Sequence, residues 1–157
     1  MLTLKQQAAK FRNAIYRAKR HGDLDWHPTF AKFPDDCCDM TCDLLGQYLL
    51  ESGIETYQIN GVNKYDSSWH HVWLVTTECV IVDITGDQFV GKILNEEEVD
   101  PVHVGREGIV HKIFCMKQMR EENTRFDDPC DYSGFGGRPS FRQERLIRLN
   151  NAIRKYL

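Results

Sequence analysis

Three residue types that together support nucleophilic catalysis follow one another along the chain. Cys38 comes just after an acidic, proline-containing stretch, His71 stands in the segment HHVWLV, and Asp83 stands in CVIVDIT. Thiolate is the nucleophilic form of cysteine, and a histidine beside it can take its proton. A carboxylate can orient the imidazole and stabilise its charged form. Such chemistry requires elements that bring the three side chains together.

The stretch FPDDCCDMTCDLLGQYLLESGI predicts a helix that carries the cysteine. Its apolar side chains recur at three- and four-residue spacing, and Gly53 closes the pattern. Residues 34–36 (PDD) give a helix-start signal, which places Cys37 and Cys38 in the first turn. The partial positive charge of a helix start favours thiolate, but the acidic neighbours oppose it. A partner base is therefore needed.

Two short strands are predicted to supply that base and its orienting carboxylate. HHVWLV alternates polar and apolar residues as a half-buried strand does, and CVIVDIT is apolar enough for a central strand. A hairpin of the two would set Asp83 within reach of His71. Neighbouring residues on a strand face opposite sides of a sheet, so only one of His70 and His71 can point at Cys38. We choose His71 and expect His70 to be exposed or beside the site.

The order of these motifs resembles the transglutaminase-like superfamily of cysteine enzymes. The matching residues are Cys38, Gly53-Ile54, His71-Val72-Trp73 and Asp83-Ile84-Thr85. Members usually carry the Gly of Gly-Ile 15 residues after the nucleophile, and 53 − 38 = 15 selects Cys38 over Cys37. The segment INGV at residues 59–62 is similar to the first strand after that helix in bacterial relatives, including the leader-peptide proteases of lasso-peptide pathways.

The resemblance covers residues 33–89 and implies an α+β fold with a papain-like core, in which a nucleophile-bearing helix packs on an antiparallel sheet. It implies Cys38 as nucleophile, His71 as base and Asp83 as the orienting carboxylate. The implied reaction is attack on a peptide or carboxamide carbonyl through a thioester, without cofactor or metal. Water as acceptor gives a protease or deamidase, which we favour; an amine gives a transglutaminase, and acyl-CoA as donor gives an acetyltransferase. The sequence departs from the pattern in its adjacent second cysteine, its paired histidines and Asp87, which competes with Asp83.

Several aromatic and polar residues near these motifs are candidates for binding a peptide or protein amide substrate. A segment leading to the nucleophile and loops beside catalytic groups often shape specificity, although a solvent-exposed turn is an equally good interpretation of the loop NKYDSS. The candidates are Trp26, Tyr65, Trp69, His70 and Asp87.

Length and composition predict one domain over residues 1–157, because 157 residues with 41% hydrophobic content suffice for a single core. We expect the catalytic core at about residues 33–116, flanked by amphipathic helices at about 3–20 and 140–157 that lie side by side. Within the core, PVHVGREGIVHKIFCM, residues 101–116, predicts one or two further strands.

The stretch EENTRFDDPCDYSGFGGRP, residues 121–139, is rich in Gly, Pro and Asp and predicts a long irregular loop. In a compact domain such a loop is usually functional or mobile. A lid over the thiol and a plain connection are equally good expectations.

Charge and hydropathy exclude several classes of function. A net charge of −3 and a pI near 6.1 give no general case for nucleic-acid binding. The chain has neither the apolar core of a secretory signal nor a run long enough to cross a bilayer, so we expect a cytoplasmic protein without membrane contact. In that compartment the six cysteines are expected to be thiols.

Other chemistries use the same residues. Cys38 and Cys42, one helical turn apart, could bind zinc together with His70 or His71. The vicinal pair Cys37-Cys38 could act as a redox sensor. A catalytically silent domain of the same fold could hold a peptide or protein partner in the cleft between helix and sheet. These remain alternatives to the thiol enzyme.

Overall fold

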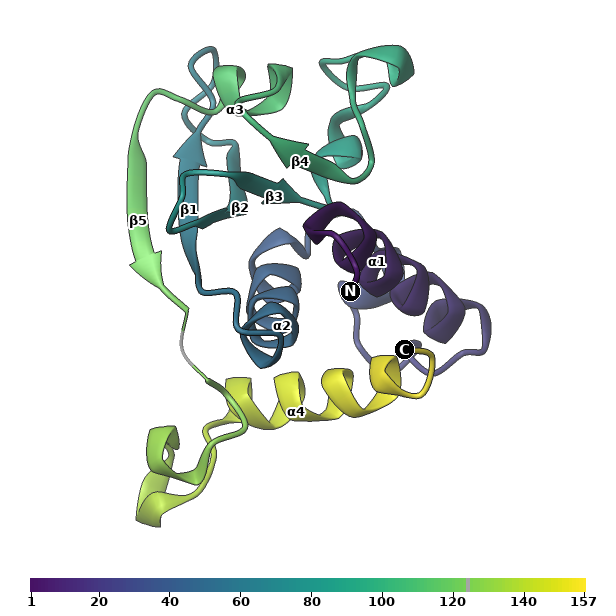
Figure 1. The fold of residues 1–157 in the computed structure, drawn as a ribbon, viewed down its shortest axis with the longest axis vertical. Helices are drawn as coiled ribbons and strands as arrows, with labels where there is room; N and C mark the ends of the chain where they lie inside the picture. The colour runs from purple at the N-terminus through teal and green to yellow at the C-terminus, as the bar shows by residue number, and fades with distance from the viewer. Residues whose placement is uncertain (124) are drawn as a thin grey trace.

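The computed structural model describes residues 1–123 and 125–157, and over these residues the fold is α+β with a five-stranded antiparallel sheet (Figure 1). The strands lie in the order β4-β3-β2-β1-β5, so the chain adds β3 and β4 on one side of the central hairpin and β5 on the other. Their bounds are β1 Thr56–Val62, β2 His70–Thr76, β3 Ile81–Asp83, β4 His103–Gly105 and β5 Gln118–Glu122.

The main helices gather on one face of the sheet (Figure 1). Helix α2 packs on β2 and β1, and α1 and α4 pack against α2 and against each other, as the sequence predicted for the flanking helices. None of the helices in the described part of the chain has the length and apolar character needed to cross a bilayer. The helices are α1 Leu4–Arg20, α2 Cys38–Glu51, the short α3 Ile109–Ile113 and α4 Phe141–Arg154.

The alternation of side chains along β2 divides the core in two. Val72 and Leu74 belong to the larger cluster, which they share with α1, α2 and α4. Trp73 belongs to a second cluster that also contains Phe89 and Phe114. Each fully buried large apolar side chain contributes about 1.5–3 kcal/mol relative to exposure. Both faces of β2 are therefore held, and the strand is a rigid support for a site.

The predicted start of the nucleophile helix is wrong by four residues. Residues 34–36 precede the helix, Cys37 is the N-cap and Cys38 is the first helical residue. Asp36 has a φ of 58°, a left-handed conformation that a continuing helix cannot contain. The end is as predicted, because Gly53 has a φ of 79° just after the last turn. Cys38 therefore lies even closer to the unpaired N–H groups of the helix start than the sequence suggested.

The sequence predicts one or two strands in residues 101–116, and the structure has one of them. Strand β4 is present, but the following residues form α3 instead of a strand. Val110 and Phe114, four residues apart, enter the same apolar cluster, and the Gly108 N–H donates to His111 Nδ1 at the helix start. A short apolar run fits a helix and a strand equally well by pattern alone, which is why the sequence misled.

The predicted irregular loop at residues 121–139 begins as the end of β5. Asn123 Nδ2 donates to Thr56 Oγ1 at 2.6 Å, which fastens the chain to the start of β1. With Leu50 and Thr56 the segment lines a hollow of about 610 Å³ at the end of α2 opposite the cysteine pair. Thr124, within the expected lid, lies outside the described residues. The described contacts of Asn123 are therefore made at the start of β1.

Candidate active site

The hairpin of β2 and β3 brings His71 and Asp83 together, as the sequence predicted. The strands pair antiparallel, and continuing their register places Asp83 across from Trp73, two residues from His71. The His71 Nε2 atom lies 2.7 Å from Asp83 Oδ2. The two residues are only 0% and 3% exposed. In such surroundings a hydrogen-bonded ion pair is shielded from water and holds a fixed geometry.

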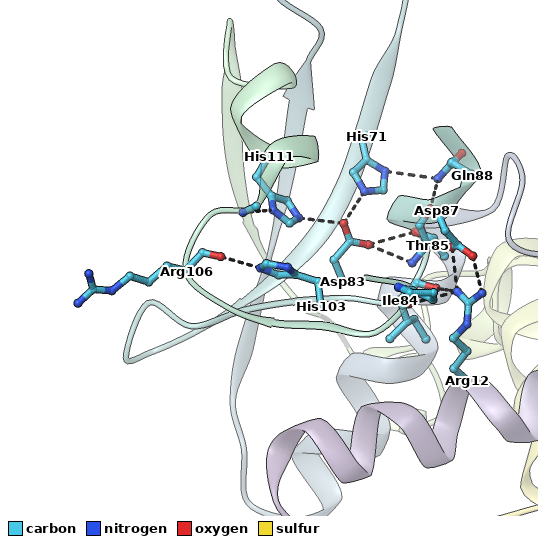
Figure 2. Close-up of polar contacts among 12 residues, drawn as sticks. Arg12, His71, Asp83, Ile84, Thr85, Asp87, Gln88, His103, Arg106 and His111 are labelled. Atoms are coloured by element: carbon cyan, nitrogen blue, oxygen red, sulfur yellow. Dashed lines mark hydrogen bonds and ion pairs between the residues drawn. The ribbon is translucent and has the colours of Figure 1, made fainter. Parts of the chain in front are cut away.

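Three further hydrogen-bonding groups contact the carboxylate of Asp83 (Figure 2). His111 Nε2 lies 2.9 Å from the same Oδ2 atom, while Thr85 donates its backbone N–H to Oδ1 at 3.0 Å and its hydroxyl at 3.4 Å. Burial opposes the charged carboxylate, but His71 and His111 outweigh it and hold the pKa of Asp83 well below its usual range. Asp83 is therefore a fixed negative charge.

His71 carries a proton more readily than an ordinary histidine. Burial opposes its charge, but the Asp83 carboxylate, followed by a hydrogen bond and charge interaction with Cys38, raises the pKa of His71 to about 10. Because Nε2 faces Asp83, Nδ1 is the atom left for Cys38. Cys38 is half-buried at the first position of α2. Gln88 contacts both His71 Nδ1 and the backbone N–H of Asp36, two residues before Cys38. The fold thus sets the His71–Asp83 pair beside the start of the helix that carries Cys38.

The raised pKa of His71 makes stability depend on pH. In the unfolded chain the ring loses its proton near pH 6.5, as an ordinary histidine does, but in the fold it keeps the proton until about pH 10. Counted on His71 alone, the folded state binds more protons between these values. In Cys38→Ser, which has no thiol to lose a proton in exchange, the free energy of unfolding should therefore fall with rising pH, by up to about 1.4 kcal/mol per pH unit. Urea unfolding at intervals from pH 7 to 9 measures this slope.

Cys38→Ser/His71→Gln is the control for that slope, since the two proteins then differ only in the ring that titrates. Its free energy of unfolding should change less steeply over the same interval. An equal slope in both proteins would show that His71 is not protonated in the fold.

The other two cysteines of the segment are placed differently from Cys38. Cys37 is completely buried in the larger core cluster, and burial raises its pKa to about 12, although the Thr41 hydroxyl donates to its sulfur at 3.8 Å. Burial also raises the pKa of Cys42 well above its ordinary value. All six cysteines are free thiols, as predicted. Of the three in this segment, only Cys38 combines partial exposure with a base.

Gln88 is a site residue that the sequence did not reveal. Its Nε2 donates to the Thr85 carbonyl at 3.0 Å and lies 3.5 Å from His71 Nδ1, and its Oε1 accepts from the Asp36 N–H at 3.4 Å. The side chain therefore ties the residues before α2 to the turn after β3 and to the ring. A glutamine in a short turn, Gly86–Phe89, carries no signal of this role in the sequence.

Aromatic rings surround His71. Its ring centroid is 5.1 Å from that of Phe89 and 5.6 Å from those of Trp73 and Phe114. Trp69, a predicted binding residue, is half-buried and stacks on Phe89 with centroids 6.2 Å apart. These rings limit the access of water to the imidazole, and Trp69 stands one ring away from it.

Asp87, which competed with Asp83 in the sequence, has a different partner. Its carboxylate receives two hydrogen bonds from Arg12, the shorter at 2.6 Å (Figure 2). The same guanidinium donates to the Ile84 carbonyl. Asp87 also lines, with Gln88, a hollow of about 560 Å³ next to the site. Asp83, not Asp87, is therefore the partner of His71, and Asp87 holds α1 to the turn.

The remaining predicted binding residues have other surroundings. Tyr65 is 79% exposed in its loop, and His70 is exposed at the start of β2. Trp26 donates its Nε1–H to the Asp23 carbonyl, and the guanidinium of Arg148 on α4 covers its ring at 3.9 Å from the centroid. Trp26 therefore joins the segment after α1 to α4.

The zinc alternative needs at least three ligands around one point. Within residues 1–123 and 125–157, no group of three or more His, Cys, Asp or Glu side chains is arranged to hold a metal ion. Nothing in the geometry of the described cysteines and histidines therefore supports a zinc site.

Comparisons with known proteins identify no relative of this chain. No protein-family model matches it, and neither a curated protein nor a solved structure does. Any function assigned to the chain therefore rests on the chemistry of these side chains.

Proposed function

We propose that the chain is a cysteine-dependent hydrolase or acyl transferase for peptide or protein amides, with a transglutaminase-like, papain-type core. One observation carries the proposal: Cys38 begins a helix that packs on β2, the strand of the buried His71, whose Nε2 lies 2.7 Å from Asp83. Nucleophile, base and orienting carboxylate in this order form the arrangement that activates a thiol. The motif order of the superfamily assigns the same three residues.

The proposed reaction has two halves. His71 Nδ1 holds the proton of Cys38, and the sulfur attacks the carbonyl carbon of the amide to form a tetrahedral intermediate. The C–N bond then breaks as His71 gives its proton to the leaving nitrogen, and a thioester on Cys38 and a free amine or ammonia result. In the second half His71 takes a proton from water and the hydroxide adds to the thioester carbon. The C–S bond then breaks as His71 returns its proton to the sulfur, which releases the acid and regenerates the Cys38 thiol. An amine in place of water completes an acyl transfer.

Two N–H donors, one on Cys38 itself and one in contact with the ring of His71, suit the negative oxygen of the intermediate. The backbone N–H of Cys38 is at a helix start and has no intrahelical acceptor. Gln88 Nε2 has two hydrogens, of which one goes to the Thr85 carbonyl and the other points toward His71 Nδ1. Once Nδ1 is protonated it no longer accepts, so that second hydrogen is free for the oxygen.

Water is the acceptor we favour, since it reaches a half-buried thiol without a site of its own. We place the reaction in the cytoplasm, where thiols remain reduced; six free cysteines suit that compartment. The hollow of about 560 Å³ that Gln88 lines is a space for a substrate. It would equally serve a silent peptide-binding module, which differs from the enzyme in an inert Cys38.

Alkylation by iodoacetamide, located by mass spectrometry, tests the proposal without a substrate. At pH 6 Cys38 should react at least about tenfold faster than Cys79, an exposed thiol of the same chain, because a protonated His71 favours the thiolate. His71→Ala should remove that advantage. If Cys38 reacts no faster than Cys79 while circular dichroism shows an intact fold, the thiol enzyme is excluded and the binding module takes its place.

A further inference from the structure

His111, which the mechanism above does not use, makes a defined contact with the triad. It lies on α3, is only 2% exposed, and its Nε2 is 2.9 Å from Asp83 Oδ2, the oxygen that His71 also contacts (Figure 2). On the other side of the ring, the Gly108 backbone N–H donates to His111 Nδ1 at 3.0 Å. Both ring nitrogens are thus engaged.

These two contacts decide the protonation of the ring. A nitrogen that accepts a hydrogen bond carries no proton, so Nδ1 of His111 is bare and Nε2 carries the N–H that reaches Asp83. A second proton on Nδ1 would point straight at the Gly108 N–H and lose that hydrogen bond. His71 has no such restriction, because the Gln88 amide contacts its Nδ1 only at 3.5 Å, and the sulfur of Cys38 can accept a hydrogen bond from a protonated Nδ1.

We propose that His111 is a positioning residue that stays neutral and presents a fixed Nε2–H to Asp83, so that of the two histidines sharing this carboxylate only His71 takes up the proton. The inference rests on the proposed thiol chemistry, in which the charge must appear on the ring beside Cys38. The contact between Gly108 and His111 thus determines which of the two rings at Asp83 Oδ2 becomes charged.

The shared oxygen also sets how strongly His71 holds its proton. A hydrogen bond to a carboxylate is strongest when no cation neutralises the carboxylate, so His111 stabilises Asp83 more when His71 is neutral than when it is charged. His111 therefore lowers the pKa of His71 from the value that Asp83 alone would impose. Loss of the donor should raise it. Thr85 continues to hold the other oxygen of Asp83, so the carboxylate keeps its place.

Other titratable groups face His111 from the elements around it. From β4 the His103 ring lies with its centroid 4.8 Å away. Glu98 and Asp100, from the segment before β4, line a hollow of about 20 Å³ together with both rings and Asp83. This space suffices for about one water molecule. His103, the more exposed of these two rings, must therefore be observed alongside His111.

Nitrogen-15 NMR of the histidine rings, recorded on the full chain from about pH 5 to pH 11, follows each nitrogen separately. Two variants divide the contacts of His111. In His111→Asn the amide oxygen can occupy the place of Nδ1 and accept from Gly108, but no donor reaches Asp83. In His111→Gln the amide nitrogen can occupy the place of Nε2 and keep that donor.

In the wild type, His111 should keep a bare Nδ1 and a protonated Nε2 throughout the titration. His111→Asn should raise the pKa of His71 by about half a unit, which is about threefold in proton affinity, and His111→Gln should leave it within about 0.2 units. Any of three results would overturn the inference. They are a protonated His111 Nδ1 at any pH in this range, equal shifts of the His71 pKa in the two variants, and no shift of the His71 pKa in His111→Asn. An inert Cys38 in the alkylation experiment would refute the proposed function while these ring signals remained as expected.

Discussion

Replacing Cys38 with alanine is expected to abolish hydrolysis of any peptide or amide substrate, with a loss of at least about 10⁴-fold. The reason is that no other thiol in the segment can take over: Cys37 is fully buried and its pKa is raised to about 12. The measurement is amine or ammonia release from a library of peptide amides. In the same reactions, intact-mass spectrometry should detect a thioester adduct on the wild type and none on Cys38→Ala.

Cys37→Ala is the matched control, one residue away in the same turn of chain. It removes a sulfur from the core and should cost about 1–2 kcal/mol of stability, but it should retain most of the activity. Similar losses of turnover in the two folded variants would show that Cys38 is not the sole nucleophile. The pair of variants therefore tests the choice between adjacent cysteines.

Asp83→Ala is expected to lower the free energy of unfolding by about 3–5 kcal/mol. The substitution leaves the buried Nε2–H groups of His71 and His111, together with the Thr85 N–H, without their common acceptor. Burial then disfavours a protonated His71, so the alkylation of Cys38 at pH 6 should slow as well. Urea denaturation at pH 7 measures the stability, and iodoacetamide measures the thiol.

Asp87→Asn is the control, because it removes a neighbouring carboxylate while the contact between Asp83 and His71 stays in place. Asp87 binds Arg12 and has no contact with His71, so its replacement can cost stability but should leave the alkylation rate of Cys38 within about twofold. If Asp87→Asn slowed alkylation as much as Asp83→Ala, the orienting role would have to be shared between the two carboxylates.

The sequence by itself determined the elements that depend on near neighbours in the chain. The β2–β3 hairpin follows from strand alternation and a short turn, and its antiparallel pairing is enough to bring Asp83 to His71. The end of α2 follows from Gly53, whose left-handed conformation is easy only for glycine. Because these contacts span few residues, local pattern and spacing were sufficient to predict them.

Only the tertiary structure decided which distant side chains complete the site. His111 reaches Asp83 from a short helix that the sequence predicted as strand, and Gln88 reaches His71 from a turn with no catalytic signature. Arg12, on the first helix, removes Asp87 from the competition for His71. Each contact depends on how α1, α3 and the turn pack against the sheet. Such packing is set by the whole apolar core, which a pattern read along one segment does not contain.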